Sequence, residues 1–209
     1  MNGFTQLLDG YRRFRNNDWP RQHERWAELR EGQSPQVMVI ACSDSRVDPA
    51  QIFDVSPGEI FVVRNVANLV PPFEEGGGRH GVSAALEFAV TQLEVPHIVV
   101  MGHGSCGGCQ AALWRRFHDA PHGEGGFIAH WVDMLDDARN RIVAEHGDGE
   151  EGARAMELET VRISLANLRT FGFVEDRLRA GTLRLHGSYF AIRDGILHVM
   201  ADDGNFAPA

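Results

Sequence analysis

Three short, predominantly apolar segments in the first half of the chain constrain its fold more than any other feature. They are rich in β-branched residues and read QVMVIA at 36–41, EIFVVRN at 59–65 and PHIVVMGH at 96–103. A helical pattern, GVSAALEFAVTQLE at 81–94, lies between the last two. Apolar strands separated by helices indicate a parallel sheet that is covered on both faces. We therefore expect an α/β fold built on a mostly parallel central sheet with flanking helices.

The two ends of the chain differ from this centre. Residues 4–31 carry apolar side chains at roughly helical spacing, and Pro20 predicts a break into two helices because proline disrupts a helix interior. Helical patterns dominate from Gln110 to about residue 171, and their acidic residues are expected to form a solvated face. The stretch TLRLHGSYFAIRDGILHVM at 182–200 predicts two strands joined by a turn, which adds a late antiparallel strand to the sheet.

The length of 209 residues suits one α/β domain with a full hydrophobic core and is short for two. We therefore expect a single domain over residues 1–209. Its predicted parts are an N-terminal helical arm at 1–34, an α/β core at 35–126, and C-terminal helices with closing strands at 127–209.

Composition and charge argue against several classes of partner and location. A net charge of −9 without a basic cluster predicts that nucleic acid is not a partner. No apolar run reaches the roughly 18 residues that a membrane span needs, so we expect no membrane association. The N-terminus lacks the apolar core of a secretory signal, and three cysteines are too few for a disulfide scaffold. Both features favour a reducing, cytoplasmic location.

The segment GHGSCGGC places His103, Cys106 and Cys109 close together, separated almost only by glycine. Cys106 and Cys109 form a C-x-x-C, which is the spacing of redox dithiols and of half a structural zinc site. His103 and Cys106 form an H-x-x-C, which would supply half of a metal site that is completed elsewhere. The motif alone leaves both interpretations open.

The predicted topology favours the metal site. In open parallel sheets, functional groups collect beyond the carboxyl ends of the strands. Cys42 follows the first predicted strand, while His103 and Cys106 follow the third. Two thiolates and one imidazole suit tetrahedral Zn²⁺, and three protein ligands leave the fourth position for water, as in catalytic zinc sites.

Longer motifs around these residues resemble those of the β-class carbonic anhydrases. The segments ACSDSRVDP, PGEIFVVRNVANLV and IVVMGHGSCGGC look like the three core blocks of that family, in its order and spacing. The similarity covers most of the chain. It implies a zinc lyase that hydrates CO₂ reversibly to bicarbonate and a proton by a zinc-bound hydroxide. The resemblance assigns one Zn²⁺ per chain to Cys42, His103 and Cys106.

Asp44 and Arg46, in the segment CSDSR, are the predicted catalytic pair. An arginine partner keeps Asp44 ionised through a charge-assisted pair, so that Asp44 can only accept a hydrogen bond and would orient the zinc-bound hydroxide. The family also has a closed state, in which this aspartate leaves its arginine and becomes the fourth zinc ligand.

The closed state goes with four other residues in the family, namely a Trp and a Gly on the first strand, an Arg, and a late Tyr. The matching residues here are Val39, Ala41, Arg64 and Phe190. Only the arginine is retained, so we expect a site that stays open at neutral pH, with Arg64 in a structural role.

The resemblance also implies a substrate pocket across a subunit interface. Gln33 would donate a hydrogen bond to the substrate oxygen, and Phe61, Val66 and Phe88 would line the apolar wall. The N-terminal arm is expected to expose a set of aromatic rings and to pack on a partner subunit, in a homodimer or a dimer-of-dimers tetramer. These rings belong to Tyr11, Phe14, Trp19 and Trp26.

Three alternatives remain beside the anhydrase. The same scaffold would serve a hydrolase of CS₂ or COS, or a protein that binds bicarbonate without turnover. A structural-zinc or dithiol module would instead use Cys106 with Cys109. That reading needs a second C-x-x-C, or one that opens a helix near the N-terminus, and the sequence has neither. We therefore expect Cys109 to serve in packing.

Overall fold

The computed structural model describes residues 2–76 and 80–209, in two compact units, Met1–Ser34 and Pro35–Ala209. The first unit is helical. Asn2 caps its first helix by accepting a hydrogen bond from the Thr5 N–H. Its segments are α1 (Gly3–Arg13), the π-helical η1 (Phe14–Asp18), α2 (Trp19–Arg21) and α3 (His23–Glu31). The predicted division into three parts, at 1–34, 35–126 and 127–209, remains a prediction.

The predicted break at Pro20 is wrong in position, because the helix passes through Pro20 and ends at Arg21, with Gln22 as its C-cap. Proline lacks the N–H that an α-helix would use at this point. The wider π-helical turn of η1 lies immediately before it, and Pro20 occupies the first turn of α2, where a missing N–H is tolerated.

Three of the four arm aromatics predicted to be exposed pack on one another within the first unit. Trp19 and Trp26 stack with ring centroids 5.2 Å apart, and Phe14 meets both rings edge-on. These three rings are half-buried, whereas Tyr11 is 59% exposed on α1. Sequence reasoning missed this cluster because the π-helical turn changes which residues share a face.

The second unit is built on a sheet whose described strands follow the order β2-β1-β3-β4-β5-β6. The first four run parallel, and β5 and β6 return antiparallel. This confirms the predicted α/β fold with a mostly parallel sheet and a late antiparallel strand. The strands are β1 (Val37–Cys42), β2 (Ile60–Asn65), β3 (His97–His103), β4 (Arg184–Ala191), β5 (Ile196–Met200) and β6 (Phe206–Pro208).

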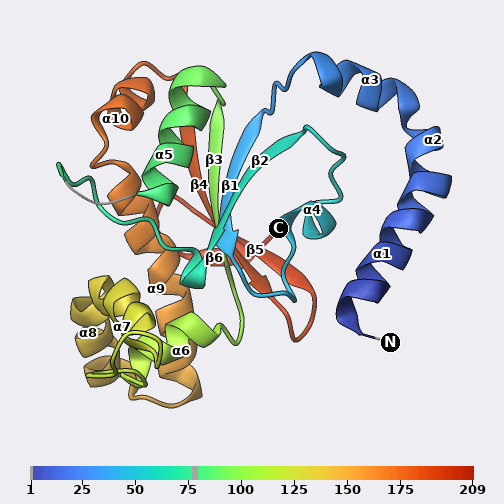
Figure 1. Cartoon of the computed structure of the whole chain (residues 1–209). Helices are drawn as coiled ribbons and strands as arrows, with labels where there is room; N and C mark the ends of the chain where they lie inside the picture. Colours follow the sequence, from blue (N-terminus) through green and yellow to red (C-terminus); the bar gives the residue numbers. More distant parts are fainter. Residues whose placement is uncertain (1, 77–79) are drawn as a thin grey trace. The chain divides into compact units, whose positions relative to one another are not determined.

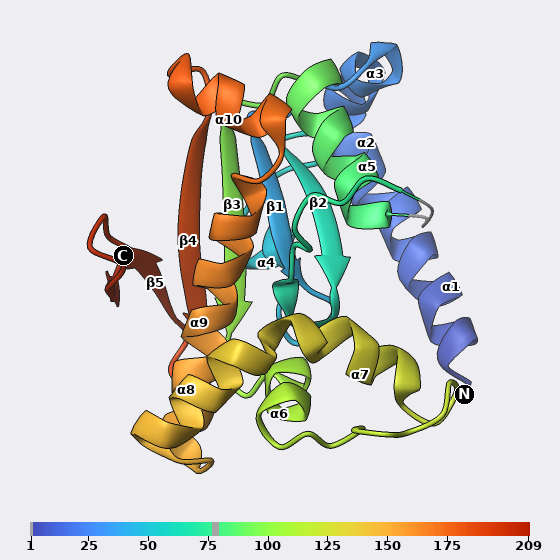
Figure 2. The same cartoon turned by 90° about the vertical axis from the view of Figure 1, so that its left-hand side faces the viewer.

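Helices cover the sheet and one of its ends. In Figure 2, α5 and α9 lie along one face, while α6, α7 and α8 lie beyond the carboxyl ends of the parallel strands. The helices are α4 (Pro49–Ile52), α5 (Gly81–Glu87), α6 (Gly107–Leu113), α7 (Gly126–Val132), α8 (Asp136–His146), α9 (Glu150–Leu168) and α10 (Gly172–Arg179), with short segments η2 (Val66–Asn68), η3 (Phe88–Gln92) and η4 (Asp133–Leu135). None of the described helices is long and apolar enough to cross a membrane.

Alternation along β1 sends its side chains into two separate cores. Met38 and Ile40 join the cluster that contains Leu86 of α5 and Val161 of α9. Successive residues of a strand point to opposite faces, and Ala41 therefore belongs to a second cluster, as do Met101 and the three cysteines. That second cluster includes Cys42 and Cys106, two of the three predicted metal ligands.

Candidate metal centre

The sheet itself brings the predicted ligands together. β1 ends at Cys42 and the adjacent parallel strand β3 ends at His103, with Ala41 paired to Met101 in the register. Parallel neighbours finish at the same edge, so the two side chains meet beyond it. Cys106 follows β3 by three residues and is the N-cap of α6. Figure 1 shows α6 below the sheet.

Cys42, His103 and Cys106 form a compact, buried group. Their candidate ligand atoms all lie within 4.8 Å of one another, and the side chains are 5%, 1% and 0% exposed. The two Sγ atoms are 3.9 Å apart. Tetrahedral zinc with Zn–S bonds of about 2.3 Å places two sulfur ligands about 3.8 Å apart, so this separation fits the ion.

His103 is oriented to offer one ring nitrogen to the group. Its Nδ1 lies 2.9 Å from the Gly104 carbonyl oxygen, which can only accept, so Nδ1 carries the proton. The lone pair then resides on Nε2, which is buried and has no hydrogen-bond partner. A metal-binding imidazole is commonly fixed in this way by a hydrogen bond from its other nitrogen.

The thiols are held in a place that disfavours their ionisation without a cation. A hydrogen bond with Cys106 and burial raise the pKa of Cys42 to about 12. A hydrogen bond with Cys109, followed by burial, raises the pKa of Cys106. A coordinated metal ion deprotonates its thiol ligands outright. Two buried thiols beside a buried lone pair therefore fit a soft divalent cation.

Asp44 and Arg46 form a bidentate pair next to Cys42. The Nε and Nη2 atoms of Arg46 donate to the two carboxylate oxygens of Asp44 at 2.9 and 2.6 Å, and the Arg46 N–H adds a third bond at 3.0 Å. The guanidinium holds the pKa of Asp44 well below its usual range. Arg46 also donates to the Ser105 carbonyl at 3.0 Å, which links the segments that carry Cys42 and Cys106.

Arg64 of β2 holds the same segment from the other side. It donates to the carbonyl oxygens of Cys42 at 2.9 Å, Asp44 at 2.7 Å and Val47 at 3.3 Å. It also pairs with the Asp48 carboxylate at 3.1 Å. These bonds to the backbone fit the structural role predicted for Arg64.

Cys109 is not a member of the metal group, although its thiol neighbours that of Cys106. It is 2% exposed, lies near the start of α6, and its Sγ is 3.7 Å from the Thr160 hydroxyl. The described residues that form the metal group do not include it. This placement agrees with a packing role and gives no support to the dithiol alternative.

Glu157 is a residue that sequence reasoning missed. The acidic residues of this region were expected on a solvated face, but Glu157 of α9 is 4% exposed. Its Oε1 accepts from the Cys106 N–H at 3.1 Å and its Oε2 accepts from the Tyr189 hydroxyl at 2.8 Å. Burial raises the pKa of Glu157, and these two hydrogen bonds oppose that effect. One signal was available, since Glu157 lies one helical turn before Val161 on the buried face of α9.

The four predicted pocket residues fall in three places. Val66 directly follows β2 and borders the metal-ligand segment, since a Cβ placed on Gly108 would come within 2.6 Å of Val66 Cγ1. Phe61 and Phe88 stack on each other, with centroids 6.0 Å apart, further back along the edge strand β2. Gln33 is exposed at the end of the first unit, and its place in a pocket remains a prediction.

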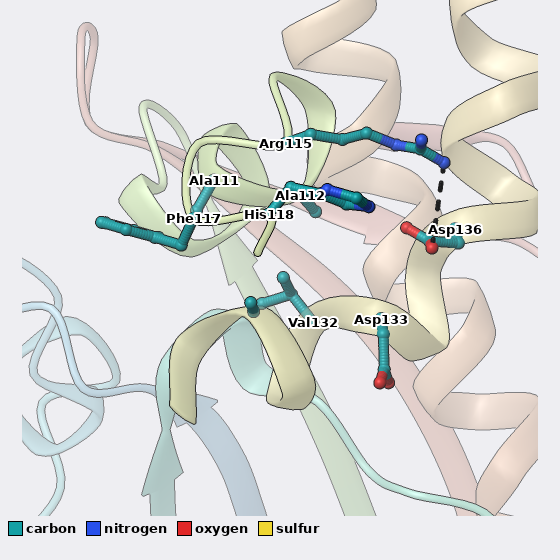
Figure 3. A pocket seen from close by; sticks show the side chains of 9 residues that line it. Ala111, Ala112, Arg115, Phe117, His118, Val132, Asp133 and Asp136 are labelled. Carbon is teal, nitrogen blue, oxygen red and sulfur yellow. Dashed lines mark ion pairs between the residues drawn. The ribbon is translucent and has the colours of Figure 1, made fainter. Parts of the chain in front are cut away.

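A separate small cavity lies between α6, the segment after it, and α7. Its volume is about 60 Å³, and Arg115 and Asp136 face each other across it in a 3.9 Å ion pair (Figure 3). The residues that line it include alanines, Val132 and His118, and none belongs to the metal group. This cavity is therefore separate from the candidate metal centre.

Comparison with known proteins agrees with this geometry. Residues 37–197 match the family model for carbonic anhydrase. Beta carbonic anhydrase 6, mitochondrial, from Arabidopsis thaliana is 37% identical over 191 residues, which cover 90% of this chain and 64% of that protein. This chain therefore spans slightly less than two thirds of that relative.

Solved structures show the same likeness. The β-carbonic anhydrase CcaA superposes with a TM-score of 0.90 at 28% identity, covering 99% of this chain and 92% of that one. A tetrameric β-carbonic anhydrase from the ascomycete Sordaria macrospora gives a TM-score of 0.82 at 28% identity, covering 96% and 98%. By its family match, its sequence and its fold, this chain belongs to the β-class carbonic anhydrase family.

Proposed function

We propose that this chain catalyses the reversible hydration of CO₂ to bicarbonate and a proton, with one Zn²⁺ held by Cys42, His103 and Cys106. The observation that carries the proposal is the buried group of two thiols and one imidazole whose Nε2 has no partner, beside an Asp44–Arg46 pair. Zinc in such a site supplies a Lewis acid that makes hydroxide available from water near neutral pH.

Asp44 orients the nucleophile in this proposal. Its carboxylate is ionised and held through both oxygens by Arg46, so it can accept a hydrogen bond but cannot donate one. A water-derived O–H that donates to Asp44 would leave an oxygen lone pair free to bond to the carbon of CO₂, and the proton lost from the water would pass to solvent.

Uncharged, linear CO₂ requires an apolar wall beside this group. Val66 borders the metal-ligand segment and is 38% exposed, so its side chain is available to face a substrate. We propose that Phe61 and Phe88 line this pocket across a subunit interface, and that Gln33 is the donor that holds the substrate oxygen.

We propose that the site is open at neutral pH. Asp44 is turned to Arg46, and the residues behind it on β1 are the buried, small or aliphatic Val39 and Ala41. The side chains of Val39 and Ala41 are apolar and cannot donate a hydrogen bond to a bicarbonate ion. No ion held there would compete with the backbone carbonyls for Arg64. The closed arrangement, with Asp44 as fourth ligand, would require the three Arg46–Asp44 bonds to break.

We propose a homodimer or a dimer of dimers as the working assembly. The edge strand β2 exposes Val62 at 38%, and Phe88 beside it is 45% exposed. α1 likewise presents Phe4 and Leu7, at 68% and 71% exposure, on an amphipathic helix. Solvent-exposed apolar patches of this kind mark partner surfaces, and the Sordaria macrospora relative is tetrameric. A cytoplasmic location remains a prediction, supported by three free thiols.

The test is stopped-flow CO₂ hydration between pH 6.5 and 9, on protein whose zinc content has been measured. We expect turnover with about one zinc per chain. Asp44→Ala should keep its zinc and lose turnover at pH 8 by about 100-fold, the loss expected when a reacting group is no longer held in its productive orientation. Cys109→Ser is the control and should keep both.

Either of two results would overturn the proposal. Full zinc occupancy without CO₂ hydration at any pH would leave hydrolysis of CS₂ or COS as the function to assay. Unchanged turnover in Asp44→Ala would remove Asp44 from the mechanism. A steep cooperative loss of activity below pH 8 would show instead that Asp44 closes the site.

A further inference from the structure

The segment 102–106, which carries two of the proposed zinc ligands, is pressed against α9 and β4. A Cβ on Gly104 would lie 2.9 Å from the Tyr189 hydroxyl, and one on Gly102 would lie 2.7 Å from Val161 Cγ2. Contacts below 3.0 Å exclude a side chain at both positions, so the backbone itself rests on these two elements. The Gly104 N–H also donates to the Phe190 carbonyl at 3.0 Å.

The backbone between the two ligands adopts an unusual conformation. Ser105 has a φ of +56°, which a residue with a side chain rarely adopts and which reverses the chain direction just before Cys106. Such a conformation persists only where the surroundings hold it. The Ser105 carbonyl accepts from Arg46, and the next N–H, that of Cys106, points to the carboxylate of Glu157.

Glu157 uses both carboxylate oxygens in this contact. Oε1 accepts from the Cys106 N–H at 3.1 Å and Oε2 accepts from the Tyr189 hydroxyl at 2.8 Å. Tyr189 is 2% exposed, and the Arg154 guanidinium lies 3.5 Å from its ring centroid. Arg154 and Glu157 are three residues apart on α9, so one helix supplies both sides of the support.

We infer that Glu157, braced by Tyr189, is a positioning residue that fixes the backbone direction of Cys106 and so aims its thiol at the metal. The inference rests on the proposed zinc site and extends it to side chains that do not touch the ion. The hydrogen bond is made to the backbone N–H of the ligand Cys106 itself. Its loss would therefore free the backbone of Cys106 to move, in addition to any effect on core packing. Residues that hold metal ligands in this way typically contribute 10–100-fold to metal affinity or activity.

Glu157→Ala, Glu157→Gln and Tyr189→Phe separate positioning from packing. Glutamine keeps the shape, because its carbonyl accepts from the Cys106 N–H and its NH₂ donates to the rotatable Tyr189 hydroxyl. Phenylalanine retains the buried ring and removes only the brace. Glu159→Gln is the matched control, since Glu159 lies on the same helix and pairs with Arg141 and Arg162 instead.

The measurement is the zinc affinity of each folded variant in competition with a chromogenic chelator, together with the visible absorption spectrum of the Co²⁺-substituted protein. We expect Glu157→Ala to bind zinc about 10–100-fold more weakly and to show an altered Co²⁺ d–d band. Tyr189→Phe should show a smaller loss, while Glu157→Gln and Glu159→Gln should stay within about threefold of the parent and keep its spectrum.

The outcomes distinguish this inference from the proposed function. If the parent binds zinc but Glu157→Ala matches it in affinity and Co²⁺ spectrum, Glu157 only fills the core and the inference is wrong. A Glu157→Gln variant as weak as Glu157→Ala would also contradict it, because positioning requires rescue by the isosteric side chain. A parent protein that binds no zinc would overturn the proposed function itself.

Discussion

The two segments that carry the proposed ligands are held in opposite ways. The first, 42–48, is held by cations: Arg64 donates to three of its backbone carbonyls and Arg46 to its carboxylate. The second, 102–106, is held by an anion, because Glu157 accepts from the Cys106 N–H. Arg46 joins them through the Ser105 carbonyl.

This difference follows from which backbone groups each segment leaves unpaired. After β1 the chain presents carbonyl oxygens, which a guanidinium with five donors can satisfy together. Before α6 it presents N–H groups, as every helix start does, and a carboxylate is the matching acceptor. The cationic clamp, formed by Arg46 and Arg64, holds the ligand Cys42 together with Asp44, which is proposed to orient the nucleophile. The anionic clamp, formed by Glu157, holds Cys106, which is proposed only to bind the metal.

The largest expected effect comes from removing a ligand from the second segment. Cys106→Ser should weaken zinc binding by more than the roughly 10–100-fold that loss of a supporting residue costs. Cys109→Ser, three residues away and equally buried, should bind zinc like the parent protein. Both are measured by chelator competition. Zinc lost from Cys109→Ser and kept by Cys106→Ser would show that the thiols are assigned in the wrong order.

A smaller effect is expected from the cationic clamp. Arg64→Ala leaves the carbonyls of Cys42 and Asp44 without their donor, and a hydrogen bond to a charged group contributes about 1.5–3 kcal/mol. Water can replace part of the two bonds, because the Arg64 side chain is 28% exposed. We expect the free energy of unfolding of the metal-free protein to fall by about 2–4 kcal/mol, measured by urea denaturation. The control is Arg193→Ala, whose side chain is 88% exposed, and its loss should change stability by less than about 0.5 kcal/mol. If Arg64→Ala lost no more stability than Arg193→Ala, the conformation of segment 42–48 would not depend on Arg64.

The smallest effect is expected at the opposite end of the sheet, where neither clamp reaches. His186 Nε2 lies 3.1 Å from His97 Nδ1, and burial, with the nearby charges of His97 and Arg184, lowers the pKa of His186. A lowered histidine pKa contributes stability above the unfolded-state value of about 6.5, and that contribution is lost as pH falls through the folded-state value. His186→Gln should therefore lose less stability than the parent between pH 7.5 and 5.5, measured by thermal unfolding.

His186→Gln should also leave zinc affinity unchanged. His97 begins β3 and His103 ends it, so the pair lies about 20 Å from the metal group at 3.3 Å per residue. A change in zinc affinity beyond about twofold would mean that the strands transmit a structural change from His186 to the ligands. The contacts of Arg46, Arg64 and Glu157 would then not be enough to keep the ligands in place.

The first clamp was accessible to sequence reasoning and the second was not. Cys42, Asp44 and Arg46 lie within five residues, so their chemistry is legible as one motif once the strand before them is recognised. Glu157 is 51 residues from Cys106 in the sequence. Glu159, the same residue type two positions later on the same helix, instead pairs with Arg141. The spacing from Glu157 to the buried Val161 points to the inner face of α9, but only the tertiary packing of that helix brings the Glu157 carboxylate to the Cys106 N–H.

The fold followed the same pattern. Apolar strands of β1, β2 and β3 predicted a parallel sheet correctly, because burial on both faces leaves a clear compositional signature. The short edge strand β6 (Phe206–Pro208) has no such signature and was missed. The position of the helix end near Pro20 was also wrong, because a π-helical turn is set by packing rather than by one residue type.

The central claim is that zinc is held by one ligand from the cationically clamped segment and two from the other, with Asp44 kept on Arg46. A crystal structure of the zinc-loaded protein at pH 8, with an anomalous difference map at the zinc absorption edge, tests it most directly. The account predicts one peak per chain bonded to Cys42, His103 and Cys106, with the Asp44–Arg46 bonds intact. A peak between Cys106 and Cys109, or one bonded to Asp44 at this pH, would contradict it.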